Sequence, residues 1–302
     1  MVIALGGNAL MSPTGRQSIN EEMNKLFEVS AKIARMSMKS GLQIAITHGN
    51  GTQVGDEMIK NMAPGSDIPA LPLALMTAET QASIGSAIEI SLNSKLKAGA
   101  RGFATVVTHV VVEKSDRAFS NPTKPIGPAF TSGQIKESGM PKRYRYSKYG
   151  GKYRIVVPSP RPISILETPI IKTMLKSTNV ICCGGGGIPV SVLRGTYSFE
   201  DAVIDKDRTS SLLARKIGAS MLVILTDVDY VYRDFPKRNA PIRRIKPSEI
   251  MKDLSEFSEG SIRPKIEACA EFAASGVGTG IIGSLNNLDQ IMRLRSGTII
   301  TE

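Results

Sequence analysis

The chain has 302 residues, of which 41% are hydrophobic and 22% charged, which is enough for one large globular α/β domain or two medium ones. Its 38 basic and 27 acidic side chains give a formal charge of +11, so anionic partners are the first to consider. No apolar run approaches the ~18 residues of a membrane span and the first strand-like run begins at Val2, so we expect no membrane partner, no signal peptide and a cytoplasmic location.

Apolar runs typical of β-strands alternate along the chain with longer segments of helical periodicity. Strands are predicted at residues 2–5, 43–47, 103–112, 180–183, 221–226, 279–283 and 298–301. Helices are predicted at 20–41, with Asn20 as the N-cap and Gly41 as the stop, at 73–97, and from near Asp207, Pro264 and Asn287 onward. Continuous apolar strands that alternate with helices indicate the α/β class, with a largely parallel sheet covered on both faces.

Residues 113–161 break this alternation. They are rich in Pro, Gly, Lys and Tyr with little helical period, and about fifty such residues inside a compact domain indicate a lid or small subdomain. Near its start, the stretch NPTKPIG holds Lys124 between Pro122 and Pro125. Because proline fixes its own φ and restricts the residue before it, this stretch predicts an ammonium group held in an unusually stiff turn.

The densest basic stretch, KRYRYSKYGGKYR at residues 142–154, lies in the same region. It contains six Lys or Arg, four Tyr and no acid, a mixture that could stack bases and neutralise the phosphates of a single-stranded nucleic acid. A solvated hairpin whose tyrosines pack on one side explains the pattern as well. A single short basic stretch is common on enzymes with anionic substrates, so the balance favours an enzyme without a nucleic-acid partner.

Glycines follow three of the predicted strands. Gly6 and Gly7 precede Asn8, Gly49 and Gly51 flank Asn50, and Gly184 to Gly187 form an unbroken run. The carboxyl ends of parallel strands are where ligands bind, and glycines there let backbone N–H groups approach an anion, so three such junctions predict a phosphate-handling face. Neither G-x-G-x-x-G nor G-x-x-x-x-G-K-[ST] occurs, which disfavours a Rossmann dinucleotide site and a Walker P-loop.

The three cysteines fit neither a disulfide framework nor a metal-ligand spacing. Cys182 and Cys183 are adjacent and Cys269 is distant from them. All three are expected to be buried or half-buried thiols in a reducing compartment.

Eight stretches occur in the order expected of one enzyme family. They are VIALGGNAL, THGNGTQVG, AFSNPTKPIGPAF, VVPSPRPISILE, CCGGGGIPV, AVIDKDRTSSLLA, LTDVDYVY and GSIRPKIEA. From residue 2 to about 285 the chain therefore resembles the carbamate kinases of the amino acid kinase family. The resemblance implies a three-layer α/β/α sandwich with a small protruding lid, a homodimer, and two lobes. Residues 1–200, with the lid at about 113–161, would hold carbamate or carbamoyl phosphate, and residues 201–302 would hold ATP or ADP.

The resemblance also implies phosphoryl transfer between ATP and carbamate, which requires charge stabilisation and in-line positioning of donor and acceptor. Related members that phosphorylate carboxylates carry a lysine in the first glycine-rich loop; VIALGGNAL has none, so Lys124 is expected to replace it. Lys206 and Lys265 are the other expected catalytic cations. Asp207 is expected to orient them and could also cap the following helix. Mg²⁺ is expected with the nucleotide, held by phosphates and waters, and no all-protein metal site is expected.

The expected binding residues divide into an acceptor side and a nucleotide side. The acceptor side comprises Gly6, Gly7, Asn8, Gly49, Asn50 and Gly51, whose clustered amides suit a small planar anion. The nucleotide side comprises Gly185, Gly186, Asp227, Asp229, Tyr230, Val231 and again Lys265. His48 is predicted to be structural, because carbamate needs no base to act as a nucleophile.

Two positions depart from the family pattern. Thr52 stands where carbamate kinases usually have Pro, and Arg263 stands where they usually have Gly. If the family glycine has a positive φ, Arg263 would cost about 1 kcal/mol there, and its guanidinium is expected beside the phosphates. Three functions stay open: a carbamate kinase, a relative acting on another small carboxylate or phosphate, and a non-catalytic nucleotide or nucleic-acid binding module.

Overall fold

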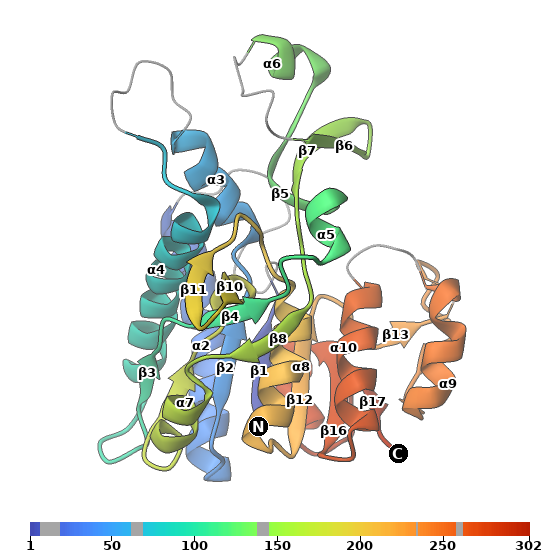
Figure 1. Ribbon diagram of the computed structural model, residues 1–302. Coiled ribbons are helices and arrows are strands. Elements are labelled where there is room, and N and C mark those ends of the chain that lie inside the picture. Colours follow the sequence, from blue (N-terminus) through green and yellow to red (C-terminus); the bar gives the residue numbers. More distant parts are fainter. Residues whose placement is uncertain (7–18, 62–68, 138–144, 234, 258–261) are drawn as a thin grey trace.

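The computed structural model describes residues 1–6, 19–61, 69–137, 145–233, 235–257 and 262–302 (Figure 1). An eight-stranded sheet runs through its centre in the order β15-β17-β16-β12-β1-β2-β9-β3. Its strands are β1 (Val2–Leu5), β2 (Ala45–His48), β3 (Phe103–Thr105), β9 (Asn179–Ile181), β12 (Met221–Thr226), β15 (Arg244–Ile245), β16 (Thr279–Ser284) and β17 (Thr298–Ile300). Every neighbouring pair is parallel except β16 with β17, which confirms the largely parallel sheet.

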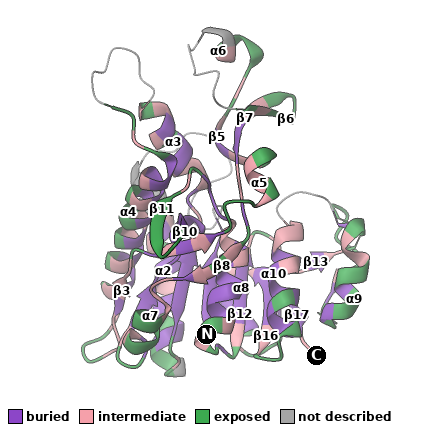
Figure 2. Cartoon of the chain, in the orientation of Figure 1, coloured by how far each residue is buried: buried purple, intermediate pink, exposed green. Residues whose placement is uncertain are grey.

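The side chains of the central strands alternate between two helix layers. In β1, Val2 and Ala4 belong to the core under α7 (Thr168–Met174), α8 (Lys206–Ile217) and α10 (Ile262–Ala274). Ile3 and Leu5 belong to the opposite core, under α2 (Ile19–Ser40), α4 (Leu73–Asn93) and α11 (Leu288–Ile291). A strand covered on both faces must be apolar at successive positions, which explains the run VIAL. Figure 2 shows these central strands buried between the helices, so the three-layer α/β/α sandwich is confirmed.

Three smaller sheets and several short helices complete the described fold. A four-stranded sheet, ordered β11-β10-β4-β8, contains β4 (His109–Val112), β8 (Pro162–Ile165), β10 (Ile188–Leu193) and β11 (Thr196–Phe199). A three-stranded sheet, ordered β5-β7-β6, contains β5 (Lys124–Phe130), β6 (Arg145–Tyr149) and β7 (Lys152–Val157), and β13 (Val231–Tyr232) pairs with β14 (Pro241–Ile242). The short helices are α3 (Gly51–Asn61), α5 (Arg117–Ser120), α6 (Ser132–Glu137), α9 (Pro247–Lys252) and the 3-10 turns η1 (Gly184–Gly186), η2 (Asp253–Glu256) and η3 (Leu285–Asn287).

The predicted lid is the part of the chain that rises from the body at the top of Figure 1. It contains the β5-β7-β6 sheet, in which β6 and β7 form an antiparallel hairpin from Arg145 to Val157. A hairpin was one of the two explanations offered for the basic stretch 142–154, and nucleic-acid binding was the other. Residues 142–144 of that stretch lie outside the described ranges. Strand β7 pairs with β5, so the hairpin is anchored to the strand that begins at Lys124.

Several predicted boundaries were wrong, among them the end of the helix predicted at 73–97, which as α4 stops at Asn93. The single strand expected at 103–112 is divided into β3, in the central sheet, and β4, in the four-stranded sheet. The division occurs at Thr108, which lies between β3 and β4. Its backbone N donates to Gln81 Oε1 of α4 at 2.9 Å, so a side chain occupies the place that a neighbouring strand would take. Asn20 is not an N-cap, because α2 already includes Ile19. Gly41 does end that helix, with a φ of +60° that favours glycine.

The strands that precede the glycine-rich junctions all end at the same edge of the central sheet. β1, β2, β9 and β12 are mutually parallel, so the residues after Leu5, His48, Ile181 and Thr226 emerge together. This edge is where an open parallel sheet binds ligands. Within the described ranges, none of the helices combines the length and apolar character that a membrane crossing requires.

Candidate active site

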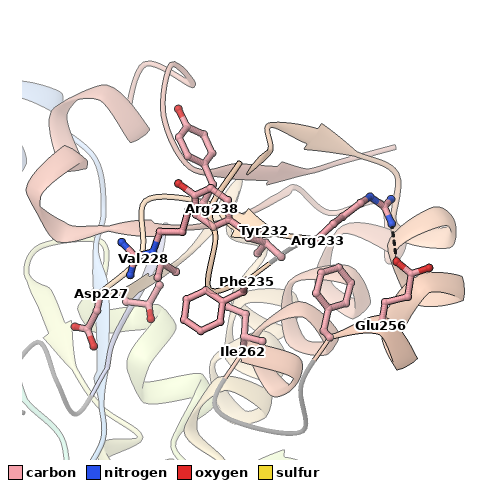
Figure 3. A pocket seen from close by; sticks show the side chains of 12 residues that line it. Asp227, Val228, Tyr232, Arg233, Phe235, Arg238, Glu256 and Ile262 are labelled. Carbon is pink, nitrogen blue, oxygen red and sulfur yellow. Dashed lines mark hydrogen bonds and ion pairs between the residues drawn. The ribbon is translucent and has the colours of Figure 1, made fainter. Parts of the chain in front are cut away.

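Two cavities open at this edge. The first, of about 320 Å³, is called here the lysine pocket; its lining includes Gly49, Asn50, Gly51, Thr52, Lys124, Arg154, Gly185, Asp205, Lys206, Asp207, Pro264 and Lys265. The second, of about 460 Å³, is called the aromatic pocket; its lining includes Asp227, Val228, Tyr230, Val231, Tyr232, Phe235, Arg238, Phe257 and Ile262 (Figure 3). The four residues expected to be catalytic, which come from three separate stretches of the sequence, therefore line one cavity.

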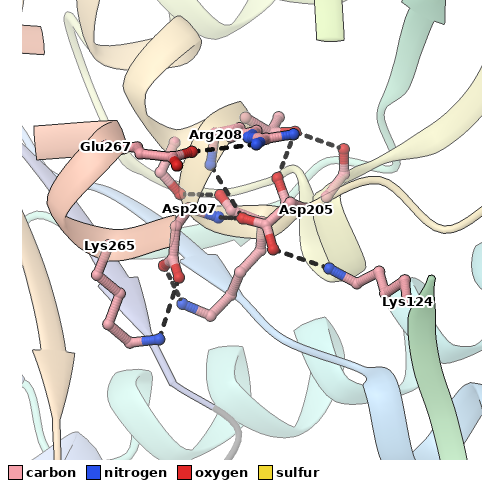
Figure 4. Close-up of polar contacts among 10 residues, drawn as sticks. Lys124, Asp205, Asp207, Arg208, Lys265 and Glu267 are labelled. Carbon is pink, nitrogen blue, oxygen red and sulfur yellow. Dashed lines mark hydrogen bonds and ion pairs between the residues drawn. The ribbon is translucent and has the colours of Figure 1, made fainter. Parts of the chain in front are cut away.

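Asp207 holds two of the three lysines (Figure 4). It lies in the first turn of α8, where its Oδ1 accepts from Lys206 Nζ and its Oδ2 accepts from Lys265 Nζ at 3.2 Å. Burial alone would raise the pKa of Asp207, but the charges of Lys206 and Lys265 outweigh it and hold the pKa below its usual range. Asp207 is therefore ionised at neutral pH and can fix the directions of both ammonium groups.

The pKa values of Lys206 and Lys265 are shifted in opposite directions, because burial and neighbouring charges balance differently at the two residues. Burial lowers the pKa of Lys206, and the neighbouring charge of Lys265 lowers it further, so the attraction of Asp207 offsets the shift only in part. For Lys265, burial also lowers the pKa, but the charges of Asp207 and Asp205 outweigh it and the pKa is raised. An anion that entered the pocket would favour the protonated form of both lysines.

Lys124 reaches the same pocket from the lid. It is the first residue of β5 and its Nζ donates to Asp205 Oδ2 at 2.9 Å. Asp205 is the N-cap of α8, since its Oδ1 accepts from the backbone N of Asp207 at 2.9 Å and of Arg208 at 3.3 Å. The cap proposed at Asp207 was therefore wrong by two residues. An aspartate directly before a predicted helix is a typical N-cap, and this signal could have identified Asp205.

The second and third glycine junctions meet beside these lysines. The Asn50 side chain donates from Nδ2 to Thr80 Oγ1 at 3.0 Å and is 2% exposed. Gly185, at a φ of +64°, packs so closely that a β-carbon there would lie 2.3 Å from Asn50 Cγ. Glycine is therefore required at this position, both for the backbone conformation and for the contact. Gly185 lines the lysine pocket with Gly49 and Gly51, and not the aromatic pocket as its expected nucleotide role would suggest.

Three more residues expected to bind the acceptor, and one expected to bind the nucleotide, come from the first and third glycine junctions. Gly6 directly follows β1, and a β-carbon there would lie 3.0 Å from the carbonyl oxygen of Leu225. Gly7 and Asn8 lie outside the described residues. Gly186 is buried and its carbonyl oxygen accepts from Thr209 Oγ1 at 2.9 Å, so it supports the start of α8 from within the core.

Arg154, on β7 of the lid, also lines the lysine pocket and was not predicted. Its Nη2 donates to the carbonyl oxygen of Gly127 at 2.6 Å, which ties β7 to the turn within β5. In the sequence, this arginine stands out only as a member of the basic stretch 142–154. The strand gives no alternating signal for this role, because Ile155, Val156 and Val157 after it are all buried, and Ile155 packs into the core between lid and body.

The aromatic pocket contains the expected nucleotide loop after β12. Asp227, Tyr230 and Val231 line it, whereas Asp229 turns to accept from Tyr232 Oη at 2.7 Å. Its walls combine rings and apolar side chains with the guanidinium groups of Arg233 and Arg238 (Figure 3). Such a lining suits a planar, mostly apolar group that carries a few polar atoms.

The first turn of α10 lies between the two pockets. Ile262 lines the aromatic pocket, while Pro264 and Lys265 line the lysine pocket. One ligand with a planar end and an anionic end could therefore occupy both cavities and cross this helix terminus, whose partial positive charge favours anions.

Comparisons with known proteins agree with this geometry. Residues 1–284 match the amino acid kinase family. The chain is 41% identical to carbamate kinase 1 of Enterococcus faecium over 317 aligned residues, covering 100% of this chain and 99% of that protein. The chain belongs to the carbamate kinases of the amino acid kinase family.

Solved structures extend the similarity to three dimensions. A carbamate kinase from Giardia lamblia bound to AMP-PNP is 34% identical, with a TM-score of 0.88 over 99% of this chain and 97% of that chain. A protein from Aeropyrum pernix, named as project APE1968, is 36% identical with a TM-score of 0.92 over 99% of this chain and 98% of that chain. The expected α/β/α fold and family are confirmed.

The two departures from the carbamate kinase pattern have modest structural effects. Arg263 lies inside α10 and is not among the described residues with a positive φ, so the expected strain does not arise. Its Nη2 donates at 3.1 Å to the carbonyl oxygen of Phe257, a residue that lines the aromatic pocket. The place of this guanidinium beside the phosphates stays a prediction. Thr52 is the second residue of α3 and faces the lysine pocket.

His48 has the environment of a structural residue in this carbamate kinase fold. It is 1% exposed, its Nδ1 lies 3.1 Å from the carbonyl oxygen of Gly49, and a β-carbon on Gly184 would lie 2.3 Å from its Nε2. Burial, together with the charge of Lys206, lowers the pKa of His48 to about 4. The imidazole is therefore neutral at physiological pH and fills the space behind the glycine junctions.

Proposed function

We propose that this protein is a carbamate kinase that transfers a phosphoryl group reversibly between ATP and carbamate, so that carbamoyl phosphate and ADP give ATP and carbamate. The observation that carries the proposal is the convergence of Lys124, Lys206 and Lys265 on one pocket, with Asp207 joining two of them. The aromatic pocket beside it suits the nucleoside. Phosphoryl transfer needs positioned cations more than covalent help, and the lysine pocket supplies them.

The proposed reaction needs no catalytic base. An oxygen of carbamate attacks the γ-phosphorus, the bond to the bridging oxygen of ADP breaks, and no proton is transferred. Lys265, in the turn between the two pockets, would contact the phosphates of the nucleotide, and Lys206 would share the transferred group with it. Lys124 would bind the acceptor side, where the amides of Gly49 and Gly51 would hold carbamate. This assignment agrees with the neutral state of His48.

Mg²⁺ is proposed as the partner of the nucleotide. Among the described residues, no group of three or more His, Cys, Asp or Glu could hold a metal ion. The carboxylates of Asp205 and Asp207 are already bonded to lysines and to the start of α8. The donor set therefore fits an ion held by phosphates and waters, which is the usual arrangement for Mg²⁺ with ATP. When bound, the ion would neutralise charge between the phosphates.

We also propose the two binding lobes, the cytoplasmic location and the homodimer that were expected from the sequence. Residues 1–200 would bind the acceptor and residues 201–302 the nucleotide. The described lining of the aromatic pocket lies within residues 226–262, which supports the nucleotide part of this division, whereas the lysine pocket takes its lining from both parts. Cys182, Cys183 and Cys269 are buried free thiols, which suit the reducing cytoplasm. A homodimer would cover exposed apolar side chains on β10 and β11, such as Leu193, which is 74% exposed, and light scattering would measure it.

A substrate panel tests the proposed function. ATP formation from MgADP should be measured with carbamoyl phosphate and, separately, with acetyl phosphate. Turnover of ~1–100 s⁻¹ with carbamoyl phosphate alone is expected. Preference for acetyl phosphate would favour a relative acting on another carboxylate. The non-catalytic alternative predicts no turnover, with salt-sensitive binding of single-stranded DNA that survives Lys124→Ala.

A further inference from the structure

Asp205 joins the start of α8 to the lid lysine Lys124 through the two oxygens of one carboxylate. Its Oδ1 is occupied by α8, accepting from the backbone N of Asp207 at 2.9 Å and of Arg208 at 3.3 Å. Its Oδ2 accepts from Lys124 Nζ at 2.9 Å. Because the helix start fixes one oxygen, the direction of the other is fixed as well, and that oxygen points to the lid lysine (Figure 4).

The lysines of the pocket divide between two carboxylates. Lys206 and Lys265 share Asp207, within the body of the protein, whereas Lys124 bonds to Asp205. The contact between Lys124 and Asp205 links residues 81 positions apart and connects β5 of the lid to α8 of the body. About a fifth of each of these two side chains is exposed, at 22% and 20%, so the pair borders the cavity.

We propose that Asp205 is a positioning residue for Lys124: it fixes the lid-borne ammonium at the rim of the lysine pocket so that carbamoyl phosphate meets it already oriented. This inference rests on the proposed function. A lysine has a flexible four-carbon stem and loses rotamer freedom when it is held, so a carboxylate that holds it in advance removes that loss from the binding step. Preorganised charges of this kind stabilise a transition state at no further reorganisation cost.

The sign of the effect distinguishes this role from a purely electrostatic one. Asp205 is an anion on the wall of a pocket proposed to bind anions, so by charge alone its neutralisation would strengthen the binding of carbamoyl phosphate. A positioning role predicts the opposite, because Lys124 would lose its fixed direction. The two explanations therefore predict changes of opposite sign for one variant.

Asp205→Asn separates the positioning role from the capping role. Asparagine caps helices about as well as aspartate and keeps one oxygen for the start of α8, but its amide nitrogen cannot accept a hydrogen bond from an ammonium group. Asp205→Ser is the second variant, since serine also caps but is too short to reach Lys124. The matched control is Asp116→Asn, because Asp116 caps α5 from Oδ1 and accepts from the backbone N of Arg161 through Oδ2, and no lysine among the described residues bonds to it.

The measurement is a double-mutant cycle on ATP formation, with carbamoyl phosphate varied at saturating MgADP and, separately, MgADP varied at saturating carbamoyl phosphate. We expect kcat/KM for carbamoyl phosphate to fall about 10- to 100-fold in Asp205→Asn, the range for one hydrogen bond to a charged group, with KM for ADP unchanged within about twofold. In a Lys124→Ala background, Asp205→Asn should change kcat/KM less than about twofold. Asp116→Asn should leave kcat/KM unchanged.

Four results would overturn the inference. They are equal or higher kcat/KM in Asp205→Asn, full additivity of the effects of Asp205→Asn and Lys124→Ala, an effect on KM for ADP as large as that for carbamoyl phosphate, and failure of both capping variants to fold, which would make Asp205 a structural cap. A wild-type protein that forms no ATP from carbamoyl phosphate would count against the proposed function instead, because the cycle needs that activity as its reference.

Discussion

Gly55 of α3 and Gly127 of β5 are in backbone contact: a β-carbon on Gly55 would lie 2.0 Å from the Cα of Gly127. Helix α3 begins at Gly51, in the glycine junction that lines the lysine pocket, and β5 begins at Lys124. The contact therefore sets the distance between the proposed carbamate-binding amides and the lid lysine. No side chain lies between the two backbones at this point, so their separation has little room to adjust.

Gly55→Ala should separate these two elements. Because the added methyl group meets backbone atoms, the lid or α3 must shift, and overpacking of this kind typically costs about 1–3 kcal/mol. We expect a melting temperature lower by a few degrees and a lower kcat/KM for carbamoyl phosphate. Gly133→Ala, in α6, is the matched control, since a β-carbon there meets only Thr131 Oγ1 at 3.9 Å. Equal behaviour of the two variants would show that the contact does not position the lid.

Arg154 should contribute to anion binding from the lid. Its side chain lines the lysine pocket and ties β7 to Gly127. Arg154→Gln removes the positive charge but keeps a polar side chain, and we expect KM for carbamoyl phosphate to rise about 10- to 100-fold, as for loss of one hydrogen bond to a charged group. Arg145→Gln, on the neighbouring strand β6, removes a charge from an exposed contact to the carbonyl oxygen of Ser120 and should leave KM unchanged. A similar rise in both variants would indicate a general effect of lid charge.

The buried His48 should make the free energy of unfolding depend on pH. In the folded protein, burial lowers its pKa from 6.5 to about 4. As the pH falls below 6.5, the unfolded chain takes up a proton that the folded protein does not, so stability is fully present above pH 6.5 and is lost toward pH 4. The slope is at most about 1.4 kcal/mol per pH unit and the total about 3 kcal/mol.

Denaturant unfolding at pH 7, 6 and 5 measures this dependence. The interval lies above the range in which the unfolded carboxyl groups of Asp205 and Asp207 titrate. His48→Gln should flatten the profile relative to the wild type. Parallel profiles for the wild type and His48→Gln would mean that His48 is not kept neutral by the fold.

Local sequence pattern was sufficient to predict the layers of the fold. Runs such as VIAL are apolar at successive positions because both faces of the central strands are covered, and this pattern needs no knowledge of distant contacts. The division of residues 103–112 could not be predicted in this way, since it depends on Gln81, which reaches the chain at Thr108 from another element. When a distant side chain takes the hydrogen-bonding place of a neighbouring strand, the alternation of apolar and polar residues in the sequence does not reveal it.

For the candidate site, too, local features could be predicted and long-range contacts could not. Lys124, Lys206, Asp207 and Lys265 could be named because each lies in a contiguous motif that resembles the carbamate kinases, and prolines also mark Lys124 and Lys265. The partnership of Lys124 with Asp205 could not, because it joins the lid to the body over 81 positions. Likewise, the close contact of Gly185 with Asn50, which lies in another glycine junction, could not be predicted from local pattern.

The most direct test of the account compares Lys124→Ala and Lys265→Ala with the wild type in ATP formation from carbamoyl phosphate and MgADP. Lys60→Ala, which removes a surface lysine paired with Glu57 on α3, is the control. We expect each pocket variant to lose at least about 100-fold in kcat/KM, with Lys60→Ala close to the wild type. Retention of activity within about fivefold in either pocket variant, in a folded protein, would contradict the claim that these lysines carry the phosphoryl transfer.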